Sequence, residues 1–431
     1  MFANSIWPHT IISLSVTDIS AYSEAVKAPA KASRDLSVFI GILLLLLLAF
    51  TTTTVWVRQA WALQFFQIGI YALLIVQVVS GFRRGTELLA GGIPSLLVYL
   101  IPLWGVMQVV AHTTSSSFET REAVLRWGAL AGVFYLSQTV TGSRISRQRF
   151  LGAFLCFATG IALLFLLQFN TSGGRVLWVF QTGFTDEIYA TFQNKNNYVQ
   201  FVEVALPIAL WQAVRQGWRS WWYVLACGLL YASAIGATSR AGFVLCSGEL
   251  LVILILCLVQ FRKSATKVPF RSAISVFLMV PAVAGVFTFA VGWQPIWQRF
   301  KDSDPFAIRR EYFLGAVEMT RHRPLTGYGL GTYEFVYQRY AIKDDVFFAN
   351  HAHDDWAEFA AEGGIPFLLL VAIPFLAVVP SMFRYPWALG LLATMLNACV
   401  DYPFPRPAVS SWMFAILGAL YMARKSGQPE N

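Results

Sequence analysis

Two of the five histidines of this chain stand one residue apart, at His351 and His353, where a loop is expected to become a helix. An imidazole titrates near neutral pH, so such a histidine could take the proton of an attacking hydroxyl group. Two other interpretations stay open. The segment could be a polar helix start, in which Asp354 and Asp355 favour the first turn, or a zinc site, since His-x-His occurs in metal sites.

Three arginines could bind an anionic ligand. Arg240 lies in a very short loop between two apolar runs, and Arg309 and Arg310 stand at the start of an expected helix. A guanidinium group matches phosphate oxygens with two parallel hydrogen bonds, so the three indicate a lipid phosphate or diphosphate. A lone arginine between two membrane spans needs a partner or a ligand, and Arg240 could instead pair with a loop carboxylate.

A metal-binding alternative comes from the motif Asp302-Ser303-Asp304 and the acidic pair Asp344-Asp345. Many glycosyltransferases use a DxD motif to hold a divalent ion on a nucleotide-sugar diphosphate. The three arginines could offset a diphosphate without any ion. We therefore predict no metal and no cofactor, and interpret the DxD as a solvated turn.

Two further signals are weaker. Glu203 and Glu249 fall inside apolar runs, where carboxylates often mark ion paths. No lysine or arginine lies inside the membrane runs beside them, so two carboxylates alone are weak evidence for an ion path. Hydrogen-bonded structural roles are therefore expected. The glycine-rich run Gly327 to Gly331 lacks the preceding strand of a nucleotide-binding loop and is predicted to be a turn.

The composition is that of a membrane protein. Of 431 residues, 57% are hydrophobic and only 13% are charged, against about 25% charged in soluble domains. Apolar runs near the ~20 residues that cross a bilayer occur about twelve times, which predicts an all-α polytopic membrane protein with about 12 transmembrane helices. The runs lie near 36–55, 61–81, 90–111, 124–141, 150–169, 197–214, 220–238, 241–261, 272–291, 364–382, 385–400 and 407–423. The five cysteines fall in these runs and are expected to be buried thiols.

Charge sets the expected orientation. Seventeen lysines and arginines lie in short loops on one side and six on the other, which predicts that both ends are cytoplasmic. The net charge of +9 then reflects topology and anionic lipid, and no nucleic acid is expected as a partner. No cleaved signal peptide is expected either.

The chain is predicted to have five parts. They are a cytoplasmic segment (1–35), transmembrane helices 1–9 (36–291), a large periplasmic loop (292–363) with short helices near 306–321 and 353–362, transmembrane helices 10–12 (364–423) and a cytoplasmic tail (424–431).

Several motifs together resemble one family. They are Asn350 to Gly364, Pro324 to Gly331, Arg309-x-Glu311, Ser239 to Gly242, and Phe192 to Asn196. In this combination they are similar to the O-antigen ligase and Wzy-type O-antigen polymerase superfamily, whose members have about twelve spans and a large late periplasmic loop. The ligase pattern places a glycine eleven positions after its histidine, and that spacing selects His353, with Gly364, over His351.

The resemblance implies a glycosyltransferase of the bacterial inner membrane, with its active site facing the periplasm. Such an enzyme moves a glycan from an undecaprenyl-diphosphate-linked donor to a hydroxyl group of lipid A-core or of another glycan. It implies His353 as the general base and Arg240, Arg309 and Arg310 as diphosphate ligands. His351 and Asn194 would also bind substrate.

Other functional classes remain as alternatives. A transporter or channel for a small anion would have broken or charged helices near the bilayer midplane and inverted repeats, which the sequence does not display. A noncatalytic subunit of a polysaccharide export assembly would tolerate the loss of His353. Ligase and polymerase stay equally open, because both use the same donor.

Overall fold

The computed structural model describes residues 16–84, 92–182, 188–216, 221–262, 270–291, 307–341 and 349–427. Regular structure in these ranges is almost entirely helical. The one sheet there is a short antiparallel hairpin of β1 (Arg175–Val176) and β2 (Phe180–Gln181). The predicted all-α class is therefore confirmed.

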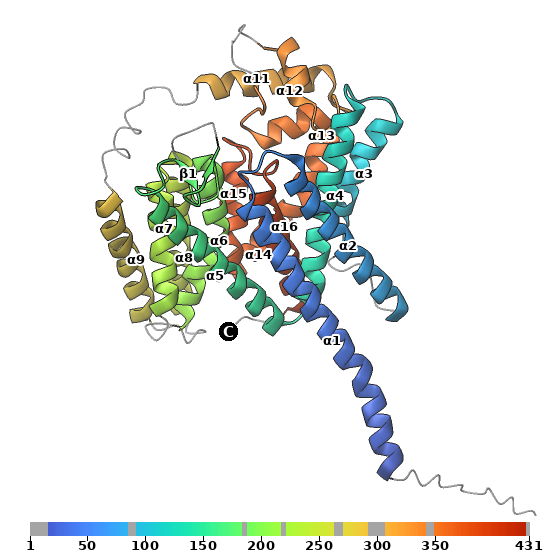
Figure 1. Ribbon diagram of the computed structural model, residues 1–431, viewed down its shortest axis with the longest axis vertical. Coiled ribbons are helices and arrows are strands. Elements are labelled where there is room, and N and C mark those ends of the chain that lie inside the picture. Colours follow the sequence, from blue (N-terminus) through green and yellow to red (C-terminus); the bar gives the residue numbers. More distant parts are fainter. Residues whose placement is uncertain are drawn as a thin grey trace, which may run out of the picture.

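The helices form a bundle, with α11 and α12 at one end and α1 projecting from the opposite end (Figure 1). Their bounds are α1 Val16–Thr53, α2 Ala60–Arg84, α3 Ile93–Val110, α4 Ser117–Val140, α5 Arg144–Gln168, α6 Lys195–Gln216, α7 Trp221–Gly236, α8 Arg240–Arg262, α9 Phe270–Val291, α11 Ala307–His322, α12 Tyr333–Val336, α13 Asp355–Leu376, α14 Val379–Arg384, α15 Leu389–Asn397 and α16 Pro407–Ser426, with 3-10 turns η2 Tyr337–Arg339 and η3 Pro386–Ala388.

Fewer helices could cross a membrane than the sequence predicts. Each of the twelve apolar runs contains helix, but within the described ranges only 6 helical stretches are long and apolar enough to span. These are Asp35–Thr53, Ala60–Arg83, Ile93–Val110, Arg144–Gln168, Arg240–Val259 and Asp355–Arg384. The structure thus supports a multi-pass membrane protein, and the count of twelve is not confirmed.

Helix α6 shows why hydropathy undercounts buried helices. It carries Asn197, Gln200 and Glu203, yet almost all of it is buried among α5, α7, α8 and α15. The Asn397 amide of α15 donates a hydrogen bond of 2.8 Å to Glu203, which confirms the hydrogen-bonded role expected for that carboxylate. Glu249 differs, because neither of its buried oxygens has a hydrogen-bond partner among the described residues. A helix enclosed by other helices need not be apolar to lie within a membrane protein.

The predicted eleventh span, 385–400, is wrong as a spanning helix. The chain there forms η3 and then α15, which has 9 residues. At 1.5 Å per residue such a helix is about 14 Å long, roughly half of a ~30 Å hydrocarbon layer. Its early end at Asn397 leaves residues 398–406 as a loop at the same end of the bundle as α11.

The segment between α9 and the membrane part of α13 has its own small core. Helix α11 occupies 307–322, within one residue of the predicted helix. Tyrosine and alanine side chains of α11, α12 and the start of α13 pack together there, among them Tyr312, Ala316, Tyr333 and Ala361. This core holds α11 beside the first turns of α13.

A kink in α13 joins this small core to the bundle. Gly364 has a φ of 74°, which L side chains rarely adopt, so α13 bends where the sequence predicts the loop helix to meet the membrane. The predicted glycine turn packs against this point, because the backbone N–H groups of Tyr328 and Gly329 donate to Ala361 and Glu362. The side-chain amide of Gln108 from α3 donates to Glu362 as well, at 2.9 Å.

The cysteine prediction is correct for three residues and wrong for two. Cys227, Cys246 and Cys257 are buried, whereas Cys156 and Cys399 are exposed. Cys399 is exposed because α15 ends before it, and it therefore lies in the loop.

Orientation can be tested with single cysteines placed in a chain that lacks the two exposed ones. Gln338→Cys lies on the α12 side and Ser426→Cys at the end of α16, and both positions are exposed. From the charge asymmetry we expect Gln338→Cys to react with an impermeant thiol reagent in intact spheroplasts, and Ser426→Cys only after permeabilisation. The opposite labelling pattern would reverse the orientation and remove the outer-face function proposed below.

Candidate functional site

The first turn of α13 is fixed against the loop that follows α15. Asp354 caps the helix by accepting the N–H of Ala357 at 2.9 Å. The N–H of Asp355 donates to Ala398, and its buried carboxylate accepts the N–H of Phe404 at 3.0 Å. These contacts bring residues 351–354 and 398–404 side by side, although α13, α14, η3 and α15 separate them in the sequence.

His353 lies in this junction beside an acid and an arginine. Its Nδ1 is 3.3 Å from Oδ1 of Asp401, and Oδ2 of Asp401 is 4.0 Å from Arg309. The Asp401 side chain is only 1% exposed, against 25% for His353 and 29% for Arg309. Arg309 also donates a 2.7 Å hydrogen bond to the carbonyl of Val400. A nearly buried carboxylate therefore lies against both His353 and Arg309 at one place.

The backbone at His353 is unusual. Its φ is 52°, in the left-handed region that non-glycine residues adopt uncommonly, asparagine, aspartate and histidine more often than the others. Such a conformation costs of order 1–3 kcal/mol and persists only where surrounding contacts impose it.

The predicted arginines are only partly brought together. Arg309, Arg310 and His353 line one pocket of about 270 Å³, with Phe313, Asp354, Cys399 and Val400 as the other lining residues. Arg240 begins α8 and does not line this pocket. It follows Ser239, whose hydroxyl donates to the Asn196 side chain at 2.9 Å.

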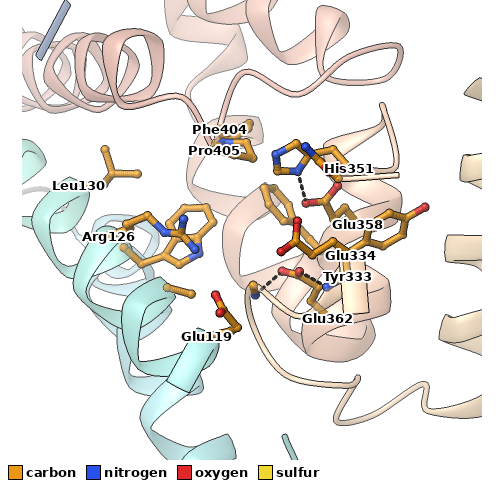
Figure 2. A pocket seen from close by; sticks show the side chains of 15 residues that line it. Glu119, Arg126, Leu130, Tyr333, Glu334, His351, Glu358, Glu362, Phe404 and Pro405 are labelled. Atoms are coloured by element: carbon orange, nitrogen blue, oxygen red, sulfur yellow. Dashed lines mark hydrogen bonds and ion pairs between the residues drawn. The ribbon is translucent and has the colours of Figure 1, made fainter. Parts of the chain in front are cut away.

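His351 belongs to a different pocket. Its Nδ1 is 2.9 Å from Oε1 of Glu358, and it lines a cavity of about 190 Å³ between α4 and α13 (Figure 2). The two histidines are thus paired with different carboxylates, Glu358 and Asp401, which is not the arrangement of a shared zinc ligand set.

Tyr402 connects the remaining predicted residue to both histidines. Its ring stacks on His351 with centroids 4.5 Å apart and meets the edge of His353 at 4.8 Å. Its hydroxyl accepts a long hydrogen bond, 3.4 Å, from the Asn194 amide. Asn194 therefore reaches the histidines through Tyr402 and contacts neither of them directly.

Comparison with known proteins adds a family to this geometry. Residues 225–372 match the family model described as O-antigen ligase. The chain carries an O-antigen ligase domain. The match confirms the resemblance seen in the sequence, supports in broad terms an O-antigen ligase-type glycosyltransferase, and does not favour an anion transporter. No curated protein and no solved structure matches the chain.

The O-antigen ligase domain contains some of the site residues and lacks others. Arg240, Arg309, Arg310, His351 and His353 fall inside 225–372. Asn194, Asp401 and Tyr402 lie outside it. The site is therefore completed by a residue just before α6 and by the loop before α16.

Sequence reasoning missed Asp401 and Tyr402. The available signal was an isolated carboxylate in a short loop expected on the same face as His353. The predicted eleventh span ends at 400, directly before Asp401, so the sequence indicates only a short connection there.

The pKa of one carboxyl group beside His353 agrees with a partly enclosed site. Burial raises the pKa of Asp354 above its ordinary value, although two backbone N–H groups lower it in part. The DxD motif at 302–304 and the pair Asp344-Asp345 lie outside the described residues. Among the residues that are described, no three metal-binding side chains converge, and metal independence stays a prediction.

Proposed function

We propose that this chain transfers a glycan from an undecaprenyl-diphosphate-linked donor to an acceptor hydroxyl group on the periplasmic face of the bacterial inner membrane. The observation that supports this most is the contact of the buried Asp401 with both His353 and Arg309, which line one pocket. A base and a diphosphate-binding cation must meet at one reacting centre, and these two do.

His353 acts as the general base in this proposal. A proton on Nδ1 would face Asp401, which leaves Nε2 to accept the proton of the acceptor hydroxyl. The hydroxyl oxygen then forms a bond to the anomeric carbon of the donor sugar as the bond from that carbon to the diphosphate breaks. The proton ends on His353, and the electron pair leaves with undecaprenyl diphosphate.

Arg309 and Arg310 stabilise the leaving diphosphate. Negative charge grows on the diphosphate during bond breaking, and fixed cations at that place lower the barrier. The hydrogen bond from Arg309 to Val400 and the nearby Asp401 hold its guanidinium in position before substrate binds. Arg240 and Asn194 remain predicted substrate ligands at the ends of α8 and α6.

The acceptor is either lipid A-core or a second lipid-linked glycan. The ligase and polymerase reactions share the base and the diphosphate ligands, so the residues described above serve both. A noncatalytic role in an export assembly would not explain why His353 is paired with Asp401.

The proposal is tested with purified protein, a lipid-linked glycan donor, and each of the two acceptors in turn. We expect transfer to one of them and unchanged activity in excess EDTA, because arginines neutralise the diphosphate without an ion. Loss of activity in EDTA that Mg²⁺ restores would move the assignment to a metal site. Absence of transfer to both acceptors, with an intact donor and folded protein, would contradict the function itself.

A further inference from the structure

A second pocket lies beside the proposed catalytic pocket. We name it the α4 pocket; Glu119, Arg126, Trp127, Glu334, His351 and Phe404 line its walls. Figure 2 shows Arg126 and Glu119 on one side of a space, with Glu334 and His351 on the opposite side. The mechanism above uses none of these residues as base or diphosphate ligand.

Some polar groups of the α4 pocket have structural partners and others do not. Glu362 accepts the backbone N–H groups of Gly331 and Tyr333, and Glu358 holds His351. The side chains of Glu119, Arg126 and Glu334 make no hydrogen bond or ion pair with any residue that the structure describes. Two carboxylates that can accept hydrogen bonds and one guanidinium that can donate them therefore face the cavity.

Aromatic rings form the rest of the wall. Trp127 lies 5.5 Å from Phe359 and 6.1 Å from Phe404 between ring centroids. Apolar walls with a few well-placed polar groups are typical of small-molecule sites. A sugar ring suits this lining, because its C–H faces pack on aromatic rings while its hydroxyl groups bond to carboxylates and guanidinium.

The charge of the lining limits which sugar fits. Four carboxylates face one guanidinium and one imidazole, so a further anionic group would be repelled. Burial, together with the neighbouring Glu119, raises the pKa of Glu334 above its ordinary value, although His351 and Arg126 lower it in part.

The α4 pocket is one aromatic ring away from the proposed base. His351 lines the pocket and stacks on Tyr402, and the same ring meets His353. A glycan bound in the pocket could therefore extend past Tyr402 toward His353. We propose that the α4 pocket binds a sugar residue of the acceptor, one that carries hydroxyl or amino groups and no anionic group. This proposal rests on the proposed transfer reaction.

The first test separates acceptor binding from catalysis. We expect Glu334→Gln and Glu119→Gln each to raise the acceptor KM about tenfold, which corresponds to one lost charge-assisted hydrogen bond. The kcat and the donor KM should stay within about twofold of the native values. Glu122→Gln, on the same helix as Glu119 but outside the lining, is the matched control and should change nothing. An unchanged acceptor KM in both pocket variants would overturn the proposal.

The second test measures binding without turnover. Methyl glucoside, methyl glucosaminide and methyl glucuronide are added to the His353→Ala protein, and saturation-transfer NMR reports which of them binds. We expect signals for the first two, about tenfold weaker binding of the glucuronide, and loss of the glucosaminide signal in the additional Glu334→Gln variant. Equal binding of all three, or of none, would contradict the pocket assignment. This result stands even if the wild-type protein transfers no glycan, so the two proposals can fail separately.

Discussion

Replacing His353 with alanine is expected to reduce glycan transfer by roughly 10² to 10⁴, the range that general-base catalysis contributes. The sugar hydroxyl would then attack without a group to accept its proton, while the arginines and the donor site stay in place. Initial rates with purified protein and saturating lipid-linked donor measure the effect, and size-exclusion profiles confirm that the variant is folded.

His351→Ala is the matched control for this substitution. His351 pairs with Glu358 in the neighbouring pocket, so its loss should cost much less in kcat. Equally small effects of the two substitutions would disprove the general-base role of His353.

Asp401→Asn is expected to lower kcat by about 10² or more. An amide is similar in shape to the carboxylate but would present an N–H group to Nδ1, which favours the wrong tautomer of His353. Loss of a base-orienting aspartate in serine proteases has a comparable cause and a cost near 10⁴. The same change removes the carboxylate beside Arg309, so donor affinity is measured in parallel.

Glu318→Gln serves as the control for Asp401→Asn, since Glu318 lies on α11 with Arg309 but pairs with the exposed Arg321. We expect full activity from it. If Asp401→Asn kept a native kcat, the pairing seen in the structure would have no catalytic role.

Local patterns predicted local structure well. The helix predicted near 306–321 lies within one residue of α11, and the predicted junction between the loop helix and the membrane run at 364 is where α13 bends. Both features depend on side chains within a few positions of each other. The His353 spacing came from the family resemblance, and the structure places this residue with Arg309 and Arg310 in one pocket.

Features that depend on distant contacts could not be predicted. Hydropathy alone does not reveal that α6 is enclosed by other helices, or that α15 stops after nine residues. The pairing of His353 with Asp401 depends on how α13 packs beside the loop after α15. Arg240 has the residue type of a diphosphate ligand, but its helix starts outside the pocket that Arg309 lines.

The wide spacing of the site residues along the chain has a consequence for folding. Asn194 and Tyr402 are 208 positions apart, and Arg309 contacts Val400 across 91 positions. Contacts of such high sequence separation form late, since the chain entropy of closing long loops is lost before they stabilise anything. During synthesis, His353 is inserted before its partner Asp401 has been made. The proposed site can therefore form only after the final helices have docked, and a fragment limited to residues 225–372 would lack Asp401 and Tyr402.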